Sequence, residues 1–303
     1  MMEDVIFVNS LTKNYGGTNV VNNVSLNVAK GDIYGIVGKN GAGKTTIMKM
    51  LLGLIPKSSG EISLFGKSDE ESLQHNRGKI GAMIETPAFY PYLTASDNLN
   101  YYRLQMGIKD KSCVKSVLKT VGLENTENKE FKNFSLGMKQ RLGLALALLG
   151  EPEVLILDEP INGLDPEGII EIREILKNLN AEKGVTIFIS SHILSELSLL
   201  ANKFAFIENG SIIAQTDIDQ IRNSAGNKTL LKTSDIERSC KIIRDKFPDA
   251  RFEIEDENIV FTLGYESEIV AVLSTNGIVV NGISNVSVSL EDYYVKLLKE
   301  YKK

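Results

Sequence analysis

The sequence predicts an α/β fold with a mostly parallel main sheet, an antiparallel sheet near the N-terminus and a small α+β domain near the C-terminus. Short, almost entirely apolar segments at residues 33–37, 154–157 and 185–189 are typical of strands that a parallel sheet buries on both faces. Residues 5–8 and the alternating run 20–28 favour strands of the N-terminal sheet. Helical patterns between the apolar segments complete an α/β order of elements.

Helices are indicated by apolar spacing and by capping residues. Residues 47–54 carry apolar side chains at helical spacing directly after a glycine-rich turn. Thr94 followed by Asp97 has the pattern of a capping box, which opens a helix. With two more helical segments after it, the region from about 88 to 150 is expected to form a helical subdomain.

A change of composition marks the boundary between two domains. Ser224, Ala225, Gly226 and Asn227 are residues of the linker type. We therefore expect one large domain at residues 1–224 and an accessory domain at 225–303.

The accessory domain carries signs of helices and strands but no visible site chemistry. Ser234 with Glu237, and Ser289 with Asp292, predict the starts of two helices. Three segments between them favour strands, at residues 251–254, 259–263 and 277–280. The last helix has an apolar stripe formed by Leu290, Tyr294, Leu297, Leu298 and Tyr301. This stripe either packs on the sheet of its own domain or contacts a second copy of the chain.

Composition excludes several classes of protein. The chain has 303 residues, a net charge of −5 and no low-complexity tract, so no basic footprint for nucleic acid is present. Its N-terminus lacks the pattern of a signal peptide, and its most apolar stretch, residues 142–150, is too short to span a bilayer. Cys113 and Cys240 are far apart and have no partners at metal-ligand spacing, so we expect reduced structural thiols.

The strongest local signal is a phosphate-binding loop between the strand at 33–37 and the helix after it. The pattern Gly-x-x-x-x-Gly-Lys-Ser/Thr predicts a nucleotide contact through Gly38, Lys39, Asn40, Gly41, Ala42, Gly43, Lys44, Thr45 and Thr46. Glycines let consecutive N–H groups converge on phosphate oxygens, and the start of the helix adds its positive dipole end. Lys44 would bridge the β- and γ-phosphates of ATP, and the Thr45 hydroxyl would bind Mg²⁺.

Two adjacent carboxylates end the apolar strand at 154–157. Asp158 and Glu159 are costly at such a position unless a cation or a proton transfer uses them. We expect Asp158 to hold Mg²⁺ and Glu159 to be the base that polarises the attacking water.

Beyond the phosphate loop, the chain resembles the ABC ATPases over about residues 3–222. The segment from Phe134 to Arg141 stands where that family has its Leu-Ser-Gly-Gly-Gln signature, with Ser135 and Gly137 matching and Leu136 and Met138 departing from it. The resemblance implies an ABC-type ATPase fold. It also implies that Ser135 and Gly137 contact the nucleotide held by the opposite subunit.

Three further segments match the family in the same order along the chain. Asn162 to Asp165 resembles the D-loop at the dimer interface, and His192 resembles the histidine that contacts the γ-phosphate. Tyr15 stands where the family has an aromatic residue that stacks on adenine. His75 has no such context and is expected to be an ordinary surface residue.

Glu85 departs from the glutamine that the family usually carries after this strand. A glutamate here resembles the branch that gives resistance to bacitracin and lantibiotics, as do residues 87–99. The resemblance implies that Glu85 senses Mg²⁺, and a carboxylate adds negative charge there.

One phosphate loop and one signature segment per chain imply a dimer that clamps two ATP molecules between its subunits. The dimer could be a homodimer or a pairing with a related ATPase chain. The resemblance further implies a polytopic membrane permease as partner, and a location at the cytoplasmic face of the cell membrane. The activity expected is ATP hydrolysis coupled to export of a peptide antibiotic.

Two other functions fit the sequence less well. A soluble ABC-type ATPase of translation or DNA repair usually has two tandem cassettes or a long coiled-coil insertion, and this chain has neither. A P-loop GTPase would carry the guanine-recognition motif Asn-Lys-x-Asp, which does not occur.

Overall fold

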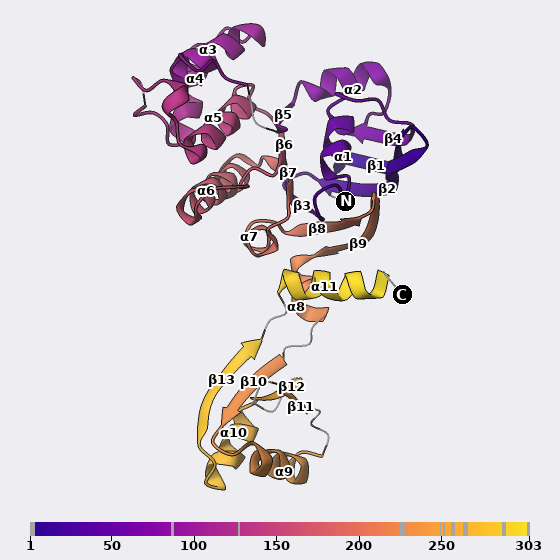
Figure 1. The fold of residues 1–303 in the computed structure, drawn as a ribbon, viewed down its shortest axis with the longest axis vertical. Helices are drawn as coiled ribbons and strands as arrows, with labels where there is room; N and C mark the ends of the chain where they lie inside the picture. The colour runs from indigo at the N-terminus through magenta and orange to yellow at the C-terminus, as the bar shows by residue number, and fades with distance from the viewer. Residues whose placement is uncertain are drawn as a thin grey trace. The chain divides into compact units, whose positions relative to one another are not determined.

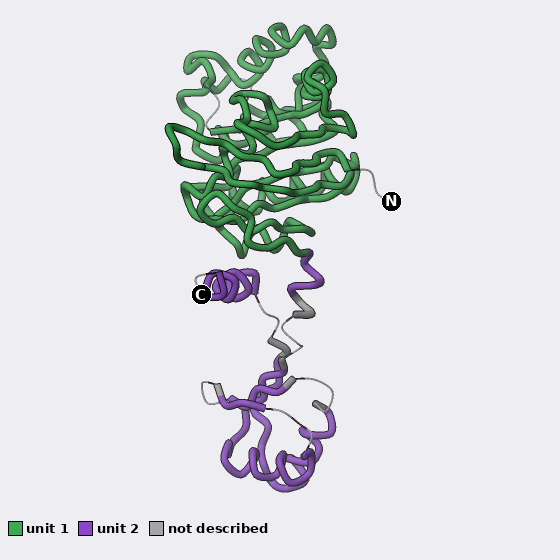
Figure 2. The backbone as a smooth tube through the Cα atoms, turned by 90° about the vertical axis from the view of Figure 1, so that its right-hand side faces the viewer, with its two compact units in different colours: residues 1–216 green, residues 217–303 purple. Residues whose placement is uncertain are grey.

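A computed structural model describes residues 4–85, 88–126, 128–224, 228–248, 250, 252–255, 258–262, 266–286 and 289–301. The chain divides into two compact units, residues 1–216 and 217–303, coloured green and purple in Figure 2. The sequence places the boundary slightly later, and residues 225–227 of that linker lie outside the described residues.

The first unit is built on a six-stranded sheet in the order β5-β6-β7-β3-β8-β9. Its strands are β3 (Ile33–Val37), β5 (Ile80–Met83), β6 (Val154–Asp158), β7 (Thr186–Ser191), β8 (Lys203–Glu208) and β9 (Ser211–Asp217). The pairs β5/β6, β6/β7, β3/β7 and β3/β8 are parallel, which confirms the predicted mostly parallel sheet. Every residue of β3, β6 and β7 is buried, and this explains their almost entirely apolar sequences.

A second, antiparallel sheet comes from the N-terminal strands, as predicted. It has the order β2-β1-β4, from β1 (Asp4–Tyr15), β2 (Thr18–Ala29) and β4 (Ser59–Leu64). Gly16 and Gly17 have φ values of 55° and 90°, a left-handed conformation that suits glycine in a two-residue hairpin turn.

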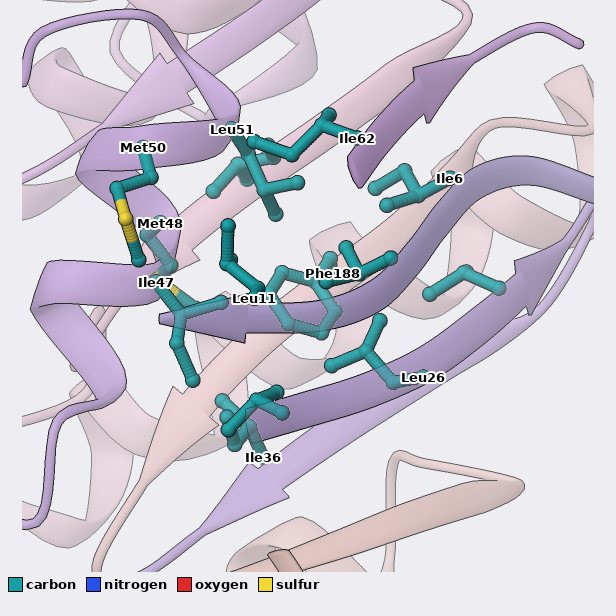
Figure 3. Close-up of a cluster of buried hydrophobic side chains, with 14 of the residues drawn as sticks. Ile6, Leu11, Leu26, Ile36, Ile47, Met48, Met50, Leu51, Ile62 and Phe188 are labelled. Carbon is teal, nitrogen blue, oxygen red and sulfur yellow. The ribbon is translucent and has the colours of Figure 1, made fainter. Parts of the chain in front are cut away.

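The main core lies between the two sheets, with α1 (Lys44–Leu51) packed into it. Figure 3 shows Ile47 and Met48 of α1 among Leu11 of β1, Ile36 of β3 and Phe188 of β7, all fully buried. The other helices that follow strands of the first unit are α2 (Glu70–Arg77), α6 (Pro166–Lys183) and α7 (Leu194–Ser198). Figure 1 shows α1 and α6 on opposite sides of the main sheet. The core therefore fixes the start of α1, and with it the phosphate loop.

A group of helices stands beside the sheets, within the predicted subdomain at 88–150 (Figure 1). It contains α3 (Ala95–Gln105), α4 (Ser112–Thr120), a short 3-10 helix (Phe131–Asn133) and α5 (Leu136–Leu148). The predicted capping box is present, since Thr94 Oγ1 accepts from Asp97 N at 3.1 Å and donates to the Asp97 carboxylate at 2.7 Å. Rings of Phe89, Phe131 and Phe134 pack in series, with centroids 5.1 and 5.9 Å apart.

The second unit has the element order of a split βαβ module, βαββαβ, after a short helix α8 (Ile218–Ser224). Its elements are β10 (Lys228–Thr233), α9 (Ile236–Lys246), β11 (Phe252–Glu255), β12 (Asn258–Thr262), α10 (Glu266–Thr275) and β13 (Val280–Val286), followed by α11 (Leu290–Tyr301). The sheet order is β11-β12-β10-β13 and each pairing is antiparallel. Leu231, Ile259 and Phe261 on one face of the sheet share a buried core with α9 and α10.

Strand β10 and helix α10 of this unit were not expected from the sequence, and two expected features differ in detail. The last strand spans 280–286, whereas we expected 277–280, where Gly277 with φ 77° belongs to a turn. Asp235 caps α9 by accepting from Arg238 N at 3.0 Å, whereas Ser234 was expected to do so. The second capping box is as predicted, with Ser289 Oγ 3.1 Å from Asp292 N.

The predicted stripe on α11 is buried only in its first half. Leu290 and Tyr294 are buried, Leu297 and Leu298 are half-buried, and Tyr301 is exposed. Across the residues described for both units, no helix has the length and apolar character needed to cross a membrane.

Candidate nucleotide-binding and hydrolysis site

The phosphate loop follows the buried end of β3 and leads into α1, as the motif requires. Gly41 and Gly43 have φ values of 83° and 110°, which favour glycine. A Cβ at Gly38 would lie 2.5 Å from the carbonyl oxygen of Ile207, so any larger residue would push the loop off β8. The loop lines a cavity of about 320 Å³ formed by Val20, Lys39, Asn40, Gly41, Ala42, Gly43, Lys44, Thr45, Thr46 and Glu159.

Lys44 is buried at the first position of α1 and is held by oxygen atoms around it. Its Nζ donates to the carbonyl oxygens of Gly38 at 2.5 Å and Lys39 at 3.2 Å. The same ammonium lies 3.2 Å from Glu159 Oε1 in an ion pair. An ammonium with several oxygen partners inside a glycine loop is placed to bind phosphate oxygens.

Asp158 stands at the centre of a hydrogen-bond network that joins three elements. One of its oxygens accepts from Thr45 Oγ1 of α1 at 2.6 Å, and the other accepts from Ser190 Oγ of β7 at 2.6 Å. Ser190 Oγ also accepts from the backbone N–H of Glu159 at 2.8 Å. One buried hydroxyl therefore holds the carboxylate of Asp158 and the backbone of Glu159 at the end of β6.

Glu159 combines a strained backbone with two charged or titratable partners. Its φ of 49° lies in the left-handed region, which costs a non-glycine residue about 1–2 kcal/mol. Its Oε2 lies 2.7 Å from Nδ1 of His192, whereas its other oxygen, Oε1, makes the contact with Lys44. Strain of this kind persists where the surroundings impose it, and it concentrates at functional sites.

Glu85 follows β5, the neighbour of β6, and also has a left-handed backbone with φ 61°. Its Oε1 lies 2.7 Å from Nζ of Lys49, one turn beyond Thr45 on α1. The pKa of Lys49 is raised, first by this hydrogen bond to Glu85 and further by the charge of Asp158. Glu85 therefore faces α1 near the candidate metal ligands.

A second cavity of about 430 Å³ gathers the other site residues, at the starts of α5 and α6. Ser135 caps α5 by accepting from Met138 N at 3.3 Å, and Asp165 caps α6 by accepting from Gly168 N at 3.0 Å. Gly137 lies in the same cavity wall. Two helix N-termini on one cavity suit an anion.

The comparisons identify the family to which these residues belong. The family model described as ABC transporter matches residues 21–162. The bacitracin transport ATP-binding protein BcrA of Enterococcus faecalis is 42% identical, over 98% of this chain and 97% of that protein. This chain belongs to the ATP-binding subunits of ABC transporters. As a member of that ATPase family, it binds and hydrolyses ATP.

One further relative and one solved structure show how much of this ABC ATPase is similar to known proteins. The lantibiotic transport ATP-binding protein SrtF of Streptococcus pyogenes is 46% identical over 71% of this chain and 92% of that protein. The structure of cbiO1 from Clostridium perfringens, part of the ABC transporter complex cbiONQ, superposes with a TM-score of 0.67 at 27% identity, over 81% of this chain and 96% of that one. The predicted ABC ATPase fold is thereby confirmed.

The structure gathers the expected site residues of this ABC ATPase into two groups. Lys44, Thr45, Asp158, Glu159 and His192 are connected through the contacts above. Ser135, Gly137 and Asp165 line the second cavity. In one chain the two groups line different cavities, as expected if each completes the site of another chain.

Tyr15 lies apart from the lining of the phosphate-loop cavity. Val20 of β2 contributes to that lining, whereas Tyr15 is half exposed at the end of β1. Nζ of Lys13 lies 4.7 Å from the centre of its ring and occupies one face of it. The role of Tyr15 in adenine stacking stays a prediction.

The residues present fit a magnesium ion. Thr45 and Asp158 bring two hard oxygen donors within 2.6 Å of each other beside the phosphate loop. In the described ranges no group of three or more acidic, histidine or cysteine side chains could hold a metal. Mg²⁺ at phosphate sites is bound through one or two protein oxygens, with phosphates and waters completing the shell, so this small donor set is sufficient.

Sequence reasoning missed two residues of this site. Ser190 is absent from the residues that the sequence analysis selects, yet it bonds to Asp158 and Glu159. Lys49 was not considered, yet it pairs with Glu85. For Ser190, a hydroxyl directly after the buried apolar run Ile187 to Ile189 was the available signal.

Proposed function

We propose that this ATPase powers the export of a peptide antibiotic of the bacitracin type through a separate, polytopic membrane permease. The observation that carries the proposal is the similarity to BcrA over 98% of the chain, which includes the second unit. The similarity to SrtF leaves more than a quarter of the chain unmatched, so it favours a lantibiotic less. Glu85, which stands where the family usually has glutamine, supports the branch that gives resistance to bacitracin and lantibiotics.

Within this function, Lys44 would bind the β- and γ-phosphates of ATP. Bound Mg²⁺ would neutralise phosphate charge, and Thr45 and Asp158 would hold it. Glu159 would accept the proton of the attacking water, and His192, whose Nδ1 contacts Glu159 Oε2, would orient that carboxylate and contact the γ-phosphate. Ser190 would keep Asp158 and Glu159 at fixed positions.

The second cavity supports a head-to-tail dimer with a two-fold axis. Ser135 and Gly137 would contribute helix N-terminal donors to the γ-phosphate bound by the other chain, and Asp165 would lie beside them. Each subunit would then complete the site of its partner. The partner is a second copy of this chain or a related ATPase chain.

Such a dimer would work at the cytoplasmic face of the cell membrane, bound to its permease. ATP would close the dimer and hydrolysis would open it, which supplies a two-state switch for transport. Net charge −5 gives no support to a nucleic-acid partner.

Capture of the partner from native membranes tests the proposal. Tagged Glu159→Gln protein would be incubated with Mg-ATP and detergent-solubilised membranes, with Lys44→Ala as the matched control. A polytopic membrane protein in stoichiometric amount with the first variant only is expected. Deletion of its gene should then raise sensitivity to bacitracin more than to a lantibiotic. Ribosomes or a soluble protein as the sole partner would contradict the transport role, and an unchanged bacitracin sensitivity would contradict the cargo.

A further inference from the structure

Among the described residues, Glu85 forms an ion pair with Lys49 of α1, the helix that carries the candidate metal ligand Thr45. Nζ of Lys49 lies 2.7 Å from Oε1 of Glu85. Lys49 and Thr45 are four residues apart on α1, so both project from the same side of the helix. Asp158, which bonds to Thr45, also acts electrostatically on Lys49. The ammonium therefore lies in the field of both acidic groups of the proposed metal site.

The ion pair between Lys49 and Glu85 lies at the surface, so the Glu85 carboxylate can readily leave Lys49 for another cation. The side chains are 31% and 68% exposed, and exposed ion pairs are weak because water screens them. A divalent ion held at Thr45 and Asp158 would attract the Glu85 carboxylate and repel the Lys49 ammonium. The two cations therefore compete for one carboxylate.

We propose that Lys49 is a positioning residue of the magnesium site, which holds the Glu85 carboxylate beside α1 and yields it when Mg-nucleotide binds. The inference rests on the proposed metal role of Thr45, Asp158 and Glu85. Its consequence concerns charge. With Lys49 present, the negative charge of Glu85 is balanced, so the pair adds no net charge to the site.

A double-mutant cycle on metal affinity tests this competition. The wild-type chain, Lys49→Met, Glu85→Gln and the double variant would be titrated with Mn²⁺ in the presence of a non-hydrolysable ATP analogue, and free Mn²⁺ read by electron paramagnetic resonance. Lys49→Met should tighten Mn²⁺ binding by about two- to fivefold, the range expected for losing one exposed pair. In the Glu85→Gln background, Lys49→Met should change the logarithm of the Mn²⁺ affinity by at most half as much as it does in the wild-type chain.

Two control variants separate the pair from general charge effects. Lys49→Arg keeps the ion pair and should restore wild-type Mn²⁺ affinity. Lys79→Met removes a lysine from another exposed pair, with Glu153 at 3.6 Å, next to the amino ends of β5 and β6 and away from the phosphate loop. It should leave Mn²⁺ affinity unchanged.

The outcomes distinguish the inference from the function on which it rests. If Glu85→Gln weakens Mn²⁺ binding but Lys49→Met acts equally in both backgrounds, the metal role of Glu85 stands and the inference is wrong. If Glu85→Gln leaves Mn²⁺ affinity unchanged, the metal role of Glu85 is wrong, and the inference falls with it.

Discussion

Ser190→Ala removes a single buried hydroxyl on which two functional carboxylates depend. Ser190 Oγ donates to Asp158 Oδ1 at 2.6 Å and accepts from Glu159 N at 2.8 Å. The side chain is fully buried, and alanine differs from serine only by the oxygen. Both hydrogen bonds are therefore lost without overpacking.

The size of the effect follows from the two bonds. A hydrogen bond to a charged group contributes about 1.5–3 kcal/mol, and a buried N–H left without a partner costs about 1–3 kcal/mol. Thr45 still holds the other oxygen of Asp158, so the metal site should survive. If about half of the lost energy appears as misplacement of Glu159, the barrier rises by about 1.3–3 kcal/mol, or roughly 10- to 150-fold in kcat.

The assay is steady-state ATP hydrolysis at saturating Mg-ATP, together with thermal unfolding. Thr186→Val is the matched control, because Thr186 Oγ1 accepts from Gly31 N at 2.9 Å at the opposite end of the same strand and is equally buried. It should lower stability by a similar order, about 1–2 kcal/mol, and change kcat less than twofold. A kcat for Ser190→Ala within twofold of wild type would refute the reasoning. An equal loss of kcat in both variants would assign the effect to the strand rather than to the hydroxyl.

Three further predictions concern the dimer, the phosphate loop and the thiols. Glu159→Gln should elute at the mass of a dimer in light scattering with Mg-ATP, while Lys44→Ala stays monomeric; a monomeric Glu159→Gln would contradict the two-cavity arrangement. Gly38→Ala should weaken binding of a fluorescent ATP analogue at least about tenfold, since its Cβ would meet a backbone oxygen of β8 at 2.5 Å and such clashes cost at least about 1–3 kcal/mol. Cys113 and Cys240 should react slowly with iodoacetamide at pH 8 and rapidly in urea, because burial raises the pKa of both thiols; fast labelling of the native chain would contradict this.

The phosphate loop, the strand ending at Asp158 and the other apolar strands of the main sheet could be predicted because local sequence determines them. A glycine turn between a buried strand and a helix has few backbone solutions, and a fully apolar run of five residues suits a strand covered on both faces. The side-chain partners could not be predicted in the same way. Lys49 and Glu85 are 36 residues apart, and Ser190 and Asp158 are 32 apart. Only the parallel pairing of β6 and β7 brings the latter together.

The cap of α9 shows a local preference decided by a distant contact. Ser234 and Asp235 are both favoured N-cap residues, and sequence spacing selected the serine. In the structure the Ser234 hydroxyl instead accepts from Val279 N at 3.1 Å, so Asp235 caps the helix. Strand β10 and helix α10 were also missed. Their buried residues, such as Leu231 and Leu273, become a recognisable core only when the sheet is assembled.

Glu85 and Glu159 share a structural arrangement that links nucleotide binding to catalysis. They follow the adjacent parallel strands β5 and β6, and both have a left-handed backbone. Each pairs with a lysine of α1, Glu85 with Lys49 and Glu159 with Lys44. In the proposed function, phosphate oxygens compete with Glu159 for Lys44, and the metal competes with Lys49 for Glu85. Binding of Mg-ATP would then break both ion pairs: the phosphates would release the catalytic base Glu159 from Lys44, and the metal would release Glu85 from Lys49.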